Sequence, residues 1–144
     1  MNFLRNTLGV LLGLGVAAIV ISFGVRIDPS WRDSYDGLSP FEHWERVLSN
    51  VKEDSGFFWT LLFSSGIGAT IGGVVTAVIV KYAKVAYAIL IGFMMLFIAM
   101  LDIIIFPYHP TFYNTLLFIM YFPFSRIGGK IAEVIFERKK RKLQ

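Results

Sequence analysis

Apolar residues fall in four long blocks, at about 6–25, 57–80, 85–106 and 111–127, and polar residues gather between and after these blocks. Each block is close to the ~20 residues that an α-helix needs to cross a ~30 Å hydrocarbon core. The blocks are apolar on all sides rather than along one stripe, which disfavours surface helices of a soluble protein. The pattern predicts an all-α, four-transmembrane-helix bundle that forms one integral membrane domain over 1–144.

Small residues recur every four positions within the first two blocks. Positions four apart share one face of a helix, so each series forms a line along which a second backbone can approach closely in a bilayer. The second block has two such lines and the first block has one, which predicts that these helices pack together. The surplus of lines also favours a homo-oligomer or a larger membrane complex. The lines are Gly9, Gly13 and Ala17; Ser64, Gly68, Gly72 and Thr76; and Ser65, Ala69, Gly73 and Ala77.

Basic residues near the ends of the blocks predict the orientation, because cytoplasmic loops carry an excess of Lys and Arg. The 81–84 connection holds two lysines, the 107–110 connection holds no Lys or Arg, and the tail over 128–144 is densely basic. This distribution predicts a multi-pass protein of the bacterial inner (plasma) membrane with both termini in the cytoplasm. The 26–56 loop and the 107–110 turn would then lie outside.

The 26–56 loop contains one predicted helix. Ser39 is a suitable N-cap, Pro40 suits the first helical position, and Glu42 stands where a capping box requires it. Apolar residues then recur at spacings of three and four, which predicts a short amphipathic helix on the outer leaflet or on the bundle mouth. These residues are Phe41, Trp44, Leu48 and Val51.

Composition narrows the classes of function. Hydrophobic residues make up 56% of the chain and charged residues 17%, and there is no cysteine, which excludes disulfides, thiolate metal sites and cysteine-based catalysis. The formal net charge of +4 has its excess in a basic run directly after the last block. That position favours anionic lipid head groups, at ~1 kcal/mol per basic residue, over nucleic acid. The run is Arg138, Lys139, Lys140, Arg141 and Lys142.

Asp102 is the only acidic residue well inside a predicted span, and an ionisable residue there is a functional candidate. It lies ~7–8 Å from the helix end at 1.5 Å per residue, near the outer interface. One interpretation is a proton or cation site that faces the bundle mouth. The other is a carboxylate that reaches water or is hydrogen-bonded to the 107–110 turn, where His109 lies.

His43, His109, Asp102 and either Glu42 or Glu45 face the same predicted compartment and are of metal-ligating types. However, no ligand spacing such as HxxxH or HExxH occurs, so an interfacial histidine hydrogen-bonded to the backbone is the stronger interpretation. We expect no metal and no cofactor. No set of nucleophile, base and orienting group can be assembled, so no catalytic residue is assigned.

Arg126 is the deepest basic residue, near the cytoplasmic end of the fourth block. Its long side chain can reach the inner head groups. Alternatively, it binds a lipid or substrate phosphate together with Lys130 and the 81–84 turn. Four hydroxyl residues of the second block either line a polar path or hydrogen-bond to neighbouring backbones: Ser64, Ser65, Thr70 and Thr76.

Motifs in the second half of the chain, FPYHPTF at 106–112, YFPF at 121–124 and GGK at 128–130, resemble a pattern of small four-helix bacterial membrane proteins with no assigned activity. The resemblance implies a bacterial plasma membrane and nothing about catalysis. The leading hypothesis is a non-enzymatic accessory or assembly subunit. The alternative is a small transporter or channel that uses Asp102 and a path lined by Ser and Thr. A water-filled cavity that reaches Asp102 or Arg126 would favour transport, and a dry bundle would favour assembly.

Overall fold

The computed structural model describes residues 2–31 and 37–144, and these form an all-α protein. Within those residues, three helices are long and apolar enough to cross a membrane, namely α1, α3 and α4. The prediction of an all-α chain with long apolar helices is confirmed to that extent. The helices are α1 (Asn2–Ile27), α2 (Pro40–Val51), α3 (Ser55–Ile79), α4 (Lys84–Ile105) and α5 (Thr111–Lys142), with a 3-10 turn, η1 (Pro29–Trp31), after α1.

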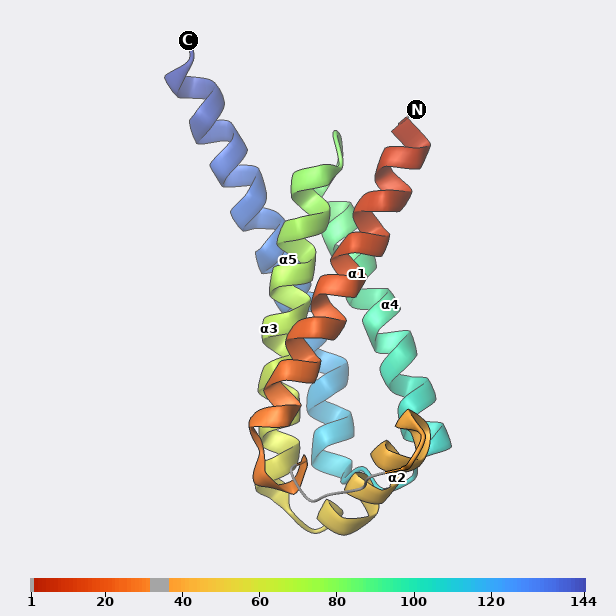
Figure 1. Ribbon diagram of the computed structural model, residues 1–144. Helices are drawn as coiled ribbons and strands as arrows, with labels where there is room; N and C mark the ends of the chain where they lie inside the picture. The colour runs from red at the N-terminus through yellow and green to blue at the C-terminus, as the bar shows by residue number, and fades with distance from the viewer. Residues whose placement is uncertain (1, 32–36) are drawn as a thin grey trace.

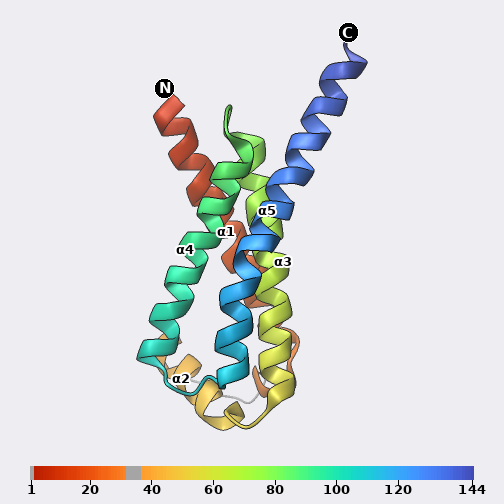
Figure 2. The same ribbon diagram turned by 180° about the vertical axis from the view of Figure 1, so that it is seen from behind.

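The helix α3 lies at the centre of the bundle and is the most buried of the three apolar helices (Figures 1 and 2). Its neighbours are α1 on one side and α5 on the other, and α4 packs mainly against α5. The helices α1 and α4 contact each other only sparsely. Both termini and the α3–α4 turn lie at one end of the bundle, called the tail end below, and α2 lies at the other end, called the α2 end (Figure 1).

One small-residue line of α3 faces α1. A Cβ atom added at Gly72 would lie 2.7 Å from the carbonyl oxygen of Gly13. One turn later, the Thr76 hydroxyl donates a 3.0 Å hydrogen bond to the carbonyl oxygen of Gly9. The two backbones approach this closely because the contact positions carry almost no side chain.

The other small-residue line of α3 faces α5 and α4. A Cβ atom at Gly73 would lie 2.7 Å from the carbonyl oxygen of Ser125, and a Cβ atom at Gly128 would overlap the carbonyl group of Thr70. Both lines are therefore used inside one chain. On α3, no small-residue line is left over for contact with a second chain, because both lines already pack against helices of the same chain.

The fourth predicted block and the basic tail form one continuous helix, α5, of 32 residues. The helix runs through Pro123, and its buried face continues at Gly128, Gly129 and Ala132, where it crosses its neighbours. Beyond that crossing, the C-terminal part of α5 leans away from the bundle (Figure 2).

The helix α2 lies across the α2 end of the bundle and begins with a complete capping box. The Ser39 hydroxyl accepts a 3.3 Å hydrogen bond from the amide of Glu42, and the Glu42 carboxylate accepts a 2.9 Å hydrogen bond from the amide of Ser39. The buried face of α2 consists of Val47, Leu48 and Val51. The helix is thus held by a local cap at its start and by apolar burial along one side.

The capping box makes the start of α2 sensitive to acid. The Ser39 amide, and then its hydroxyl, lower the pKa of Glu42 below its ordinary value of 4.5. A carboxyl whose pKa is lowered by folding stabilises the fold above its unfolded pKa, and this contribution disappears as the pH falls through the folded pKa. We expect amide exchange in the first turn of α2 to accelerate in acid relative to a Glu42→Gln variant at the same pH. The control is Glu45→Gln, which should titrate like the wild type, and identical profiles for wild type and Glu42→Gln would contradict the prediction.

Candidate functional site

Asp102 lies one turn before the end of α4, on the side that faces α2. Its Oδ1 atom accepts a 2.7 Å hydrogen bond from the indole Nε1 of Trp44 in α2. Its Oδ2 atom lies 3.0 Å from Nε2 of His109, in the turn between α4 and α5. One carboxylate therefore joins α4, α2 and the turn before α5, and its side chain is 28% exposed.

The side chain of His109 is fully buried, and both of its ring nitrogens face oxygen atoms. Nδ1 lies 2.9 Å from the carbonyl oxygen of Phe106, and Nε2 faces Asp102. A carbonyl oxygen can only accept, so Nδ1 carries a hydrogen. Nε2 and Oδ2 are thus in close contact, although their geometry is not that of a hydrogen bond.

Aromatic rings enclose this pair and exclude water from the histidine. The His109 ring stacks on Tyr113 of α5, with 5.3 Å between centroids, and meets Phe58 of α3 edge-on at 5.7 Å. Trp44 lies 6.3 Å from Phe57, which continues the cluster toward α2. The His109 ring therefore has few alternative polar neighbours besides Asp102 and the carbonyl oxygen of Phe106.

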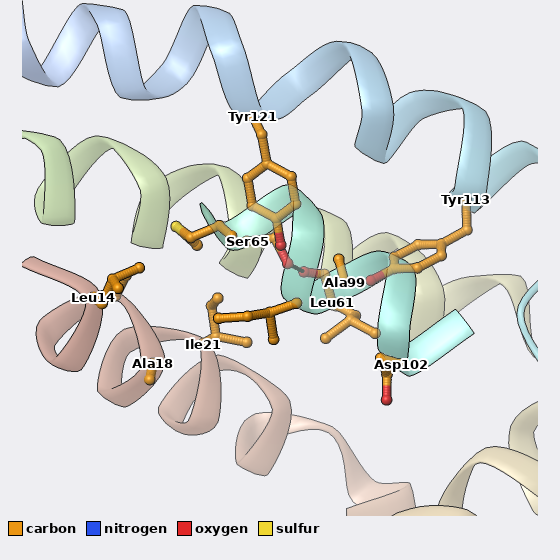
Figure 3. Close-up of a pocket in the computed structure, with 12 residues that line it drawn as sticks. Leu14, Ala18, Ile21, Leu61, Ser65, Ala99, Asp102, Tyr113 and Tyr121 are labelled. Atoms are coloured by element: carbon orange, nitrogen blue, oxygen red, sulfur yellow. Dashed lines mark hydrogen bonds between the residues drawn. The ribbon is translucent and has the colours of Figure 1, made fainter. Parts of the chain in front are cut away.

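A cavity of about 240 Å³ lies beside this pair, between α1 and α4 (Figure 3). Its wall is mainly apolar, and four polar side chains line it: Asp102, Ser65, Tyr113 and Tyr121. The hydroxyls of the two tyrosines lie close to the Ser65 hydroxyl. The apolar lining residues are Leu14, Ala17, Ala18, Ile21, Leu61, Met95, Ile98 and Ala99.

The hydroxyl residues of α3 mostly serve the helix itself. Ser64, Ser65 and Thr70 donate to the carbonyl oxygens four residues earlier in α3, at 2.8, 2.8 and 3.0 Å. Thr76 donates instead to Gly9 of α1. The hydroxyl hydrogens are therefore committed to backbone oxygens, which matches the structural interpretation of these residues and not a hydrated path.

Arg126 lies in the second half of α5, far along the helix from the Asp102 pair. It is exposed and lines a shallow groove on α5 together with Lys130 and Arg138. The 81–84 turn lies instead against Glu133, on another side of the helix. The sequence suggested one phosphate site formed by Arg126, Lys130 and the 81–84 turn. In the structure, the turn does not lie beside Arg126 in this groove.

The two histidines do not meet. The His43 ring stacks on Trp31 at 4.4 Å between centroids, while His109 is buried beside Asp102. Across residues 2–31 and 37–144, no three side chains of the metal-ligating acid, histidine and cysteine types come together.

Sequence reasoning did not identify Trp44, Tyr113 and Tyr121 as site residues. The position of Trp44 in the sequence is equally consistent with an apolar helix face and with an aromatic belt at the membrane interface. The pattern therefore gives no sign that Trp44 donates a hydrogen bond to Asp102. The two tyrosines are eight residues apart on the buried face of α5, and this spacing was the available signal that both line one cavity. The chain matches no family model, and it matches neither a curated protein nor a solved structure.

Proposed function

We propose that this chain is a non-enzymatic accessory protein of the membrane that binds a lipid-soluble molecule in the cavity between α1 and α4. The observation that carries the proposal is the cavity itself, which has a mainly apolar wall and reaches Asp102, the neighbour of His109. Its volume of about 240 Å³ equals that of about eight water molecules at ~30 Å³ each. An apolar tail along the wall with a hydrogen-bonding end near Asp102 fits both parts of the lining.

The place of the cavity supports entry from the bilayer. It is bounded by α1 and α4, the two apolar helices that contact each other only sparsely. A lipid-soluble molecule can pass between two such helices without crossing an aqueous phase.

We also propose four spans, with the first part of α5 (111–127) as the fourth, and a bacterial inner membrane with both termini in the cytoplasm. The support is twofold. Both termini and the α3–α4 turn share the tail end (Figure 1), and the basic residues concentrate at that end. In this orientation the Asp102 cavity lies in the outer half of the membrane.

The alternative is a small transporter or channel that uses Asp102. It is favoured by the place of Asp102, because an ionisable side chain that lines a cavity within an apolar bundle is a candidate site for proton or cation transport. The hydroxyls of α3 argue for the binding proposal, since they donate to backbone oxygens.

Filling the cavity should abolish binding. We expect native mass spectrometry of the protein, purified in mild detergent with a bacterial total lipid extract, to show a retained molecule. Replacement of Ala18 or Ala99 by phenylalanine should lower the retained fraction at least tenfold, or about 1.4 kcal/mol, because each side chain lines the cavity.

The matched control is Ala86→Phe, which changes an exposed alanine of α4 at the tail end. It should leave retention unchanged. Equal retention in the wild type and the cavity-filling variants would contradict the proposal, and so would an equal loss in the Ala86→Phe control.

A further inference from the structure

The C-terminal part of α5 carries a second concave surface that is unrelated to the Asp102 cavity. A groove of about 680 Å³ runs along α5 on the side opposite its buried residues Gly128, Gly129 and Ala132. The groove is formed by one helix alone, so its two walls are side chains of successive turns. The lining residues are Pro123, Arg126, Ile127, Lys130, Ile131, Val134, Ile135 and Arg138.

The lining combines three cations with four exposed branched apolar side chains. Arg126, Lys130 and Arg138 span about 18 Å of helix at a 1.5 Å rise per residue. Arg126 and Lys130 are four residues apart and therefore share one face, so their head groups can meet one anion together. Apolar side chains that face water gain nothing from their exposure, whereas an amphipathic ligand can contact both the cationic and the apolar side chains of the groove.

The charges of the groove are only partly balanced within the protein. Lys130 pairs with Glu133 at 2.7 Å. Of the three groove cations, it alone has an acidic partner in the described part of the chain. Glu133 and Glu137 lie toward the α3–α4 turn and border a different surface. The groove thus presents a net positive charge that an anion would complement.

The direction of α5 turns this groove toward a membrane surface. The C-terminal part of the helix leans away from the bundle at the tail end (Figures 1 and 2). When a helix leaves a bilayer and leans outward, the side opposite the bundle is the side that faces the adjacent leaflet. The groove is on that side, and its deepest residues, Pro123 and Arg126, come nearest the spanning part of the helix.

We propose that this groove binds one anionic phospholipid of the leaflet at the tail end. Arg126 and Lys130 bind the lipid phosphate, the guanidinium through paired N–H donors. The acyl chains lie against Ile127 and Pro123, and Arg138 meets the head-group layer. The inference rests on the chain spanning a membrane and is independent of ligand binding in the Asp102 cavity.

The test measures lipid retention with two probes, dioleoyl-phosphatidylglycerol and dioleoyl-phosphatidylcholine, by native mass spectrometry of the delipidated full-length protein. We expect one phosphatidylglycerol molecule to be retained at least tenfold more than phosphatidylcholine. The double variant Arg126→Gln, Lys130→Gln should lose this preference. Equal retention of the two lipids by the wild type would overturn the proposal.

The matched control is Lys139→Gln, Lys142→Gln, which removes the same charge from α5 outside the groove. It should retain phosphatidylglycerol within twofold of the wild type. A loss equal to that of the groove variant would overturn the proposed binding site and would indicate non-specific electrostatic attraction to α5 instead. The conservative variant Arg126→Lys should give an intermediate loss, because it keeps the charge and removes the paired donors. Glycerol phosphate at equal concentration should not displace the lipid. Complete displacement would overturn the proposal, because it would show that the groove binds the phosphate group alone and not the lipid.

Discussion

Replacing Gly128 by alanine is expected to lower the free energy of unfolding by ~1–3 kcal/mol, or more if α5 is forced off α3. A Cβ atom at this position would overlap the Thr70 carbonyl oxygen and would lie 3.0 Å from the backbone nitrogen of Val74. Both neighbours are backbone atoms of α3, which cannot rotate away as a side chain can. The measurement is unfolding in mixed micelles with increasing sodium dodecyl sulfate, followed by far-ultraviolet circular dichroism.

The control for this prediction is Gly15→Ala in α1, where nothing lies within 4 Å of the added carbon. This change should leave stability unchanged or raise it by up to ~1 kcal/mol, since alanine favours a helix more than glycine does. If the two variants unfold at the same detergent ratio, the close approach of α3 and α5 is not what holds α5 in place.

Replacing His109 by phenylalanine should destabilise the protein by ~1–3 kcal/mol, although the aromatic packing is kept. The reason is that Oδ2 of Asp102 would lose its polar neighbour, Nε2 of His109. Asp102→Asn should cost clearly less. An asparagine oxygen can still accept from Trp44, and its amide N–H can donate to a neutral His109.

The same detergent titration measures this difference, and the ranking of the two variants is decisive. Equal destabilisation by His109→Phe and Asp102→Asn would contradict the prediction. The Asp102→Asn variant also separates the two functional hypotheses in liposomes. Unchanged proton flux relative to the wild type removes Asp102 from any transport path, whereas loss of flux favours transport over simple binding.

Some elements depend only on signals that are local in the sequence. The start of α2 is an example, because Ser39, Pro40 and Glu42 are within four residues of one another and their hydrogen bonds require no other part of the chain. Long apolar blocks likewise predicted helices able to cross a membrane, and three such helices are present. The fourth span remains a prediction, since α5 joins an apolar block to a charged tail in one helix.

The candidate site was predicted in part. Asp102 stood out because a carboxylate inside an apolar block is costly, and the possibility of a hydrogen bond to the 107–110 turn was recognised. Oδ2 of Asp102 lies 3.0 Å from Nε2 of His109 in that turn, in a geometry that is not that of a hydrogen bond. The hydrogen bond from Trp44 could not be predicted, because Trp44 lies 58 residues from Asp102 in the sequence and the contact depends on how α2 folds back over the bundle.

The small residues of α3 mark the boundary between what the sequence determined and what the tertiary structure decided. Periodicity alone places Gly72 and Gly73 on adjacent faces of one helix, because 3.6 residues make a turn. It contains no information on which backbone each face meets. Only the crossing of the helices decides that Gly72 meets Gly13 of α1 and Gly73 meets Ser125 of α5, and the same crossings leave the space between α1 and α4 that ends at Asp102.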